Sequence, residues 1–308
     1  MWKLNFETIT PLHISNGNEL GYNFDYLESD GIIKKYDLAK FSKRIVDLNL
    51  FDFTKSYSYK DFSSIIDENK QHFDDDLYEY EVECTNRALN QIRSDTAEGR
   101  NVIKEFINSN GKFYVPGSSV KGALATVLNR ESIGIKNSID QKFVILDSDF
   151  IDKAKLFVDR TYKGRPSIQL ICVKPFTKFS LIVKKTGNIS LQTLKAKLKT
   201  YYKNQLTKAI ASVSKYKDDV NHEAGANLYT DILEEYQRVL KEELSDGEYL
   251  INLGYGSGSY FKIFENVKVP TFYNRKAREK QEAHTTFSFF DGEYIDHIGW
   301  CKLKIEEK

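Results

Sequence analysis

Apolar and polar side chains alternate along the first residues of the chain. Within residues 2–10, one side of the alternation consists of Trp2, Leu4, Phe6 and Thr8, and Pro11 follows. This spacing predicts a half-buried strand that ends at the proline. Residues 25–28 and 32–36 flank the turn 29–31 and predict a β-hairpin.

The apolar spacing becomes helical after the predicted hairpin. Apolar residues recur three to four positions apart in two places, at Leu38, Phe41, Ile45 and Leu48, and again at Val102, Ile103, Phe106 and Ile107. We therefore expect residues 37–110 to form a helical insertion.

The remaining segments predict an α+β fold. Ser118 or Ser119 can cap a helix that runs to about residue 130. Extended segments follow at 143–146, 156–162, 168–173, 179–184, 249–253 and 300–305, and helical ones at 191–202 and 227–244. The segments 168–173 and 179–184 read as a hairpin-like pair.

Taken in order, these elements predict the βαββαβ arrangement of an RRM-like or ferredoxin-like domain. Residues 1–36 and 111–308 would form its core, and 186–308 are a candidate second lobe. Such a fold hosts many activities, so function must be argued from particular residues.

Composition indicates a globular protein of the cytoplasm. The chain has 308 residues, of which 41% are hydrophobic. We expect no membrane association, because the longest apolar runs are far too short to span a bilayer. The three cysteines are scattered and odd in number, which is typical of reduced thiols.

Charge is strongly segregated although the net charge is only +1. Residues 153–217 hold sixteen Lys or Arg and one acidic residue, whereas 61–83 hold nine acidic residues and 218–248 hold ten. A local positive field attracts a polyanion such as RNA. Lys163 and Arg165 are the candidate contacts in this segment. The alternative is that these lysines only keep the protein soluble.

Two glycine-containing motifs are candidate phosphate contacts. The first begins a predicted helix, where free N–H groups and the helix dipole favour an anion; it consists of Gly117, Ser118, Ser119, Lys121 and Gly122. It lacks the pattern of a Walker A loop. The second follows a predicted strand and contains Gly254, Gly256, Ser257 and Gly258. The alternatives are an ordinary capped helix and a flexible turn.

Residue patterns typical of catalysis or metal binding are weak. The five histidines and three cysteines show no metal-ligand spacing, so we expect neither metal nor cofactor. His13 could act as a general acid or base, but no orienting partner lies near it in the sequence. These observations favour a binding protein over an enzyme.

Five segments together resemble the RAMP proteins of CRISPR antiviral systems. They are residues 10–17, 113–122, 173–179, 253–258 and 299–303. Their combination is most similar to the fifth subunit of the Csm (type III-A) effector. The family pattern carries a bulky residue after Gly258, where this chain has Ser259.

This resemblance implies a non-catalytic RNA-binding subunit. Such a subunit contacts the 3′ part of the guide RNA (crRNA) at the end of the filament of backbone RAMP subunits. It also supports crRNA maturation by recruiting host nucleases. His13 and the residues of both glycine motifs would then contact RNA.

Two other RAMP functions remain open from the sequence. One is an endoribonuclease that processes the crRNA precursor with His13 as a catalytic group. The other is the backbone subunit that slices target RNA, whose catalytic aspartate would lie near Asp25.

Overall fold

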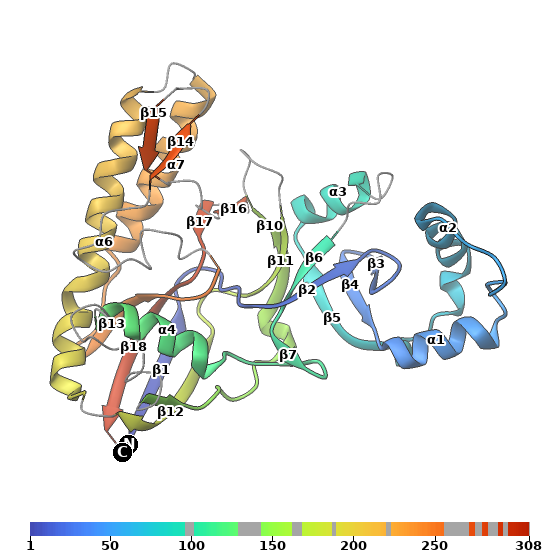
Figure 1. Ribbon diagram of the computed structural model, residues 1–308, viewed down its shortest axis with the longest axis horizontal. Helices are drawn as coiled ribbons and strands as arrows, with labels where there is room; N and C mark the ends of the chain where they lie inside the picture. Colours follow the sequence, from blue (N-terminus) through green and yellow to red (C-terminus); the bar gives the residue numbers. More distant parts are fainter. Residues whose placement is uncertain are drawn as a thin grey trace. The chain divides into compact units, whose positions relative to one another are not determined.

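The chain folds into two compact units (Figure 1). The computed structural model describes residues 1–95, 102–128, 143–161, 168–186, 189–219, 223–255, 271–274, 279–282, 289–291 and 295–307. Unit 1 comprises Met1–Ile14, Tyr114–Phe150 and Val173–Lys308. Unit 2 comprises Ser15–Phe113 and Ile151–Cys172.

Unit 1 is built on a five-stranded sheet whose neighbouring strands are all antiparallel. The strands lie in the order β13 (Glu248–Asn252), β18 (Trp300–Glu307), β1 (Trp2–Thr8), β12 (Lys178–Thr186) and β9 (Phe143–Ile145). Among its described residues, the α-helices of this unit are α4 (Gly117–Val127), α6 (Leu191–Asp219) and α7 (Glu223–Leu240). Two short hairpins pair β14 (Thr271–Asn274) with β15 (Glu279–Glu282) and β16 (Phe289–Asp291) with β17 (Ile295–His297).

The α+β fold class predicted from the sequence is confirmed. Along the chain, β1, α4, β9, β12, the α6–α7 pair and β18 follow in the expected βαββαβ order, and β13 adds a strand at the sheet edge. Helix α6 packs along α7, and it also contacts β13 and α4 (Figure 1).

Strand β1 shows why this sheet forms. Its side chains alternate between buried and partly exposed positions, as the sequence predicted. The ring of Phe6 stacks on Phe179 of β12 with 5.0 Å between ring centroids. Cross-strand pairs of this kind stabilise antiparallel neighbours.

Unit 2 contains a seven-stranded mixed sheet. Its order is β2 (Ser15–Gly21), β6 (Val102–Phe106), β11 (Gln169–Val173), β10 (Leu156–Arg160), β5 (Tyr78–Cys84), β4 (Ile32–Tyr36) and β3 (Tyr26–Ser29). Two pairings are parallel, β10 with β5 and β11 with β6. Strands β3 and β4 form the predicted hairpin.

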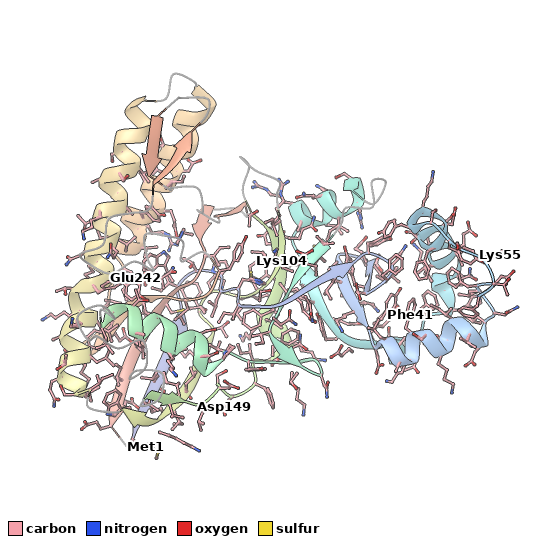
Figure 2. The ribbon with its side chains drawn as sticks, viewed as in Figure 1. Met1, Phe41, Lys55, Lys104, Asp149 and Glu242 are labelled. Atoms are coloured by element: carbon pink, nitrogen blue, oxygen red, sulfur yellow. The ribbon has the colours of Figure 1, made fainter. Side chains whose placement is uncertain are left out.

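Short helices complete unit 2. Its described α-helices are α1 (Leu38–Asp47), α2 (Tyr59–Asn69) and α3 (Asn86–Asp95). Its described 3-10 turns are η1 (Lys70–His72), η2 (Asp75–Leu77) and η5 (Lys153–Lys155). The short strand β7 (Asn108–Ser109) pairs with β8 (Lys112–Phe113). The Asp37 side chain caps α1. Phe41 of α1, labelled in Figure 2, is buried in a hydrophobic cluster. Its ring stacks on Tyr36 with 3.7 Å between ring centroids.

Two local predictions are wrong. The apolar spacing predicts a helix over residues 102–107, but Val102–Phe106 is the strand β6. A window this short carries too few repeats to separate helical from strand spacing. The segments 168–173 and 179–184 do not form a hairpin, because β11 pairs with β6 and β12 pairs with β1.

The two units divide the chain at other residues than the sequence suggested. Residues 15–36 group with unit 2 rather than with the core. Their strand β4 pairs with β5, some 45 positions later, which brings this segment into the second sheet. Residues 151–172 join the same unit. Pairings between distant segments leave no periodic signal in the sequence.

Candidate nucleic-acid interface

Residues 9–14 continue from β1 and are held on one side by the start of β18. The backbone N–H groups of Ile9 and Thr10 donate to the Trp300 carbonyl at 2.8 and 3.2 Å. In return, the Trp300 N–H donates to Thr10 Oγ1 at 2.9 Å. Thr10 and Trp300 are both buried, so these polar groups depend on each other for hydrogen bonds.

Gly299, next to Trp300, and Val173 fix the middle of this stretch. The Pro11 carbonyl accepts from the N–H of Gly299 at 2.7 Å. Leu12 and Val173 exchange both backbone hydrogen bonds, at 3.1 and 2.8 Å. The chain at residue 12 is therefore paired with the segment that leads into β12.

His13 lies against the start of the second glycine motif. Its carbonyl accepts from the Tyr255 N–H at 2.8 Å. Its imidazole is fully buried, at 0% exposure, and meets the Tyr255 ring edge-to-face with 5.7 Å between ring centroids. The structure thus brings His13 and the glycine motif together, but through buried contacts.

Close backbone approach explains two glycines at this junction. Gly254 has φ +73°, and a Cβ built on it would lie 2.3 Å from the His13 carbonyl oxygen. Gly299 has φ +95°, and its Cβ would lie 2.1 Å from the carbonyl oxygen of Leu253. Side chains are excluded at both positions by space and by conformation.

Four of the five sequence segments that resemble the RAMP family therefore meet around residues 9–14 of unit 1. Segments 173–179, 253–258 and 299–303 each hydrogen-bond to this stretch, which includes the start of segment 10–17. The sequence showed these segments in order, and the structure shows them in contact.

The fifth segment forms the start of α4. Pro116 is its N-cap, and the cap makes no side-chain hydrogen bond. The prediction that Ser118 or Ser119 caps this helix is therefore wrong, since both lie in its first turn. The Gly117 N–H donates instead to Asp147 Oδ1 at 2.8 Å, and a carboxylate there complements the helix dipole.

Gly117 is required for packing against β9. A Cβ at this position would lie 2.2 Å from the Ile145 carbonyl oxygen, so the close approach made by this glycine is to protein backbone. Ser118 is exposed, and Ser119, Lys121 and Gly122 are partly exposed. A Cβ at Gly122 would meet nothing within 4 Å. At this helix start, the residues that reach the surface therefore follow Gly117, which is itself buried.

Part of the predicted RNA-binding set lies outside the described residues. These positions are Lys163, Arg165, Gly256, Ser257 and Gly258, and their placement stays a prediction. The basic segment 153–217 supplies exposed lysines to both units, from Lys153 in unit 2 to Lys178 and Lys208 in unit 1. A single positive face likewise stays a prediction.

The two residues considered for catalysis make structural contacts. His13 is buried, as described above. Asp25 Oδ2 accepts from the Gly21 N–H at 2.7 Å and closes the turn before β3. Within the described part of the chain, no group of three or more His, Cys, Asp or Glu could hold a metal ion. No helix among those residues is long and apolar enough to cross a membrane.

Sequence reasoning missed the buried carboxylate of Glu105 in unit 2. It accepts hydrogen bonds from Asn16 Nδ2 at 2.6 Å, Asn18 Nδ2 at 3.0 Å and the Tyr80 hydroxyl at 2.8 Å. Burial raises its pKa, but these hydrogen bonds outweigh burial and hold the pKa below its usual value. A lone Glu in a short strand gives no sequence signal for such a role.

Comparisons with known proteins agree with the resemblance seen in the motifs. The model of the RAMP superfamily matches residues 5–262. A curated relative, the CRISPR system Cms protein Csm5 of Methanocaldococcus jannaschii, is 32% identical over 123 residues. That match covers 39% of this chain and 28% of the relative's length.

Two solved structures are similar to the whole chain. One is a chain of a Csm–crRNA–target RNA ternary complex of a type III-A CRISPR-Cas system, determined by cryo-EM. It has a TM-score of 0.64 and 16% identity, and the match covers 99% of this chain and 100% of that one. The other is the crystal structure of T. onnurineus Csm5, with a TM-score of 0.56, 15% identity and coverage of 96% and 99%.

At these identities the two structures show a shared fold. The family follows from the sequence model, which spans most of the chain, and it agrees with the motifs that meet around residues 9–14. The predicted likeness to the fifth Csm subunit is confirmed by the relatives found. The chain belongs to the RAMP superfamily.

Proposed function

We propose that this chain is the guide-RNA-binding fifth subunit of a type III-A effector complex. It contacts the 3′ part of the crRNA at the end of the filament of backbone subunits and supports crRNA maturation without cutting RNA itself. The observation that carries this proposal is the meeting of four RAMP-like segments around residues 9–14. The likeness to Csm5 and to a chain of a crRNA-bound Csm complex supports it.

The buried frame around residues 9–14 provides a rigid base for RNA contacts. Residues 256–258 follow directly after Tyr255, whose N–H is tied to His13. A glycine loop that starts from an anchored residue can present backbone N–H groups to a phosphate chain. Such contacts do not read bases, which suits a subunit that must accept any guide sequence.

The start of α4 supplies the second proposed contact. Ser118, Ser119, Lys121 and Gly122 reach the surface in its first two turns. Because Asp147 accepts the Gly117 N–H, a phosphate would bind beyond that carboxylate, near Lys121. The two glycine motifs would then line one channel for the crRNA.

A non-catalytic role agrees with the positions of the candidate catalytic groups. The His13 imidazole is buried, and Asp25 accepts a hydrogen bond within its own turn. General acid–base catalysis needs a group within reach of the substrate. We infer that maturation depends on recruited host nucleases of the cytoplasm, and that the backbone RAMP subunit is the neighbour of this chain in the complex.

The test is to purify the assembled complex and sequence the RNA that it retains. Lys121→Glu places a negative charge where we propose a phosphate, so the variant complex should lose crRNA carrying the 3′ part. Lys43→Glu is the matched control, because Lys43 is an exposed lysine of α1 in unit 2. Equal crRNA retention by wild type and Lys121→Glu would contradict the proposed contact.

Two further measurements address the basic segment and the absence of cleavage. Binding of the full chain to single-stranded RNA should weaken with salt at a log–log slope of about −0.7 per phosphate contact, and less steeply after charge reversal at Lys163 and Arg165. Purified protein should leave crRNA precursor and target RNA intact with and without divalent metal. Specific cleavage abolished by His13→Ala or Asp25→Ala would instead establish one of the catalytic RAMP functions.

A further inference from the structure

The turn that leads into β12 contains an unusual residue. Lys174, Pro175, Phe176 and Thr177 form a turn with proline in second place and Phe176 at φ +61° in third place. A type II turn needs a positive φ at that place and takes glycine or asparagine there. Among the described residues other than glycine, the remaining positive-φ positions are all Asn or Asp.

Phe176 is also the most exposed large apolar side chain among those described, at 75%. Its ring therefore adds little to the buried core, while its backbone conformation is strained for a residue with a bulky Cβ substituent. Folding stability alone would favour glycine here. A residue that opposes local preference without a packing gain points to a function.

Two buried threonines hold this turn in place. The Phe176 N–H donates to the Thr8 carbonyl at 2.6 Å, and the Thr177 N–H donates to Thr8 Oγ1 at 2.9 Å. The hydroxyls of Thr8 and Thr177 both donate to the Lys174 carbonyl at 2.8 Å. The ring is therefore presented from a backbone that is already ordered before any ligand binds, which reduces the entropy lost on binding.

Positive charge accompanies the ring along the chain. Lys174 and Lys178 lie two residues before and after it, and the Lys178 side chain is 77% exposed. Glu7 lies 3.5 Å from Lys178 Nζ and offsets part of this charge. In the sequence, these residues lie within the basic segment 153–217, which has sixteen Lys or Arg against one acidic residue. An exposed aromatic ring flanked by lysines is an arrangement that can bind single-stranded nucleic acid by base stacking.

We propose that the ring of Phe176 is a stacking platform for one unpaired base of the RNA that this chain holds. Lys174 and Lys178 would lie near the phosphates on either side of that base. Because every base has a π-face, the contact tolerates any sequence. This inference rests on the proposed RNA-binding function and adds a specific residue to it.

The first test compares Phe176→Gly, Phe176→Trp and wild type for binding to a labelled oligoadenylate of about 12 nucleotides, within the range of common single-strand sites. Loss of one stacked base should weaken binding by about 5- to 150-fold in Phe176→Gly. Its melting temperature should be equal to or above that of wild type, because glycine accepts a positive φ. Phe53→Ala is the control, since Phe53 is 72% exposed and belongs to unit 2.

Phe176→Trp should keep the affinity and lose tryptophan fluorescence when the oligoadenylate is added. The two native tryptophans, Trp2 and Trp300, are buried, and wild type gives their background signal. An abasic site placed at each position of the oligoadenylate in turn should weaken wild-type binding where the missing base would stack on Phe176. The same substitution should cause no further loss of affinity in Phe176→Gly, which already lacks the ring.

The possible outcomes separate this inference from the proposed function. If wild type does not bind RNA, the proposed function fails and the platform with it. If wild type binds and Phe176→Gly binds equally well, only the platform is refuted. If Phe176→Gly keeps its RNA but no longer copurifies with the other subunits, the ring docks on a protein and the stacking proposal is wrong.

Discussion

Replacing Glu105 tests how the chain after His13 is held. The Glu105 side chain is buried, at 2% exposure, and three donors converge on its carboxylate. Two of them are Asn16 and Asn18, which lie in the segment that leads from residue 14 into unit 2. The third is the hydroxyl of Tyr80, itself buried. Glu105→Ala removes the acceptor and leaves these donors without it.

The expected loss of stability follows from these contacts. A hydrogen bond to a charged group contributes about 1.5–3 kcal/mol, and such values do not add fully within one network. We therefore expect Glu105→Ala to lower the free energy of unfolding by about 3–5 kcal/mol. Glu105→Gln keeps the shape and one acceptor oxygen, but its amide group faces other donors. Glu105→Gln should therefore lower the free energy of unfolding by about 1–3 kcal/mol.

The pH dependence has a defined sign. Burial raises the pKa of Glu105, but hydrogen bonds from Asn18, Asn16 and Tyr80 outweigh it and leave the pKa lowered. The ionised carboxylate therefore stabilises the folded chain at pH values above the unfolded pKa of about 4.3. This contribution is lost as the pH falls through the lowered folded pKa. The difference in stability between wild type and Glu105→Gln should therefore shrink under acid conditions.

Urea unfolding followed by circular dichroism at pH 7 and at a series of pH values descending below the unfolded pKa of about 4.3 measures both effects. At pH 7, the decrease in the free energy of unfolding for Glu105→Gln is compared with that for Glu105→Ala. Their ratio indicates how much of the stabilisation by Glu105 depends on its negative charge. If Glu105→Gln is as stable as wild type at pH 7 and follows the same pH dependence, the carboxylate does not hold residues 16–18 as described.

The remaining predictions concern close packing and thiol reactivity. Gly117→Ala should lower the free energy of unfolding by about 2 kcal/mol, because the added Cβ would lie 2.2 Å from the Ile145 carbonyl oxygen. Gly122→Ala should raise it by about 0.5–1 kcal/mol, because that helix position has open space. Equal shifts in melting temperature for the two variants would contradict the packing of α4 on β9. Gly299→Ala combines a φ of +95° with a contact of 2.1 Å to Leu253 and should cost about 3 kcal/mol or more, seen as a large fall in melting temperature. Burial raises the pKa of the Cys84 thiol to about 12, so it should react with a thiol reagent at pH 8 far more slowly in native protein than in urea; rapid native labelling would show that this strand opens.

Much of the local structure could be predicted from the sequence. The alternation before Pro11 gave β1, and the turn at Asp30 and Gly31 gave the β3–β4 hairpin. The apolar repeats after residues 191 and 227 gave α6 and α7 with different ends. These predictions succeeded because each depends on a period that a few neighbouring residues display. The order of the motifs along the chain likewise indicated the RAMP family.

Only the tertiary structure decided how these segments combine. Residues 9–14 pair with positions 173, 255, 299 and 300, and no local period records a partner that lies 160 to 290 residues away. The same holds for the division into two units, where β4 pairs with β5 and β11 with β6. Gly117 looked like a phosphate contact, but its lack of a Cβ serves the approach of Ile145. A glycine in the sequence signals close approach, and only the fold shows what approaches it.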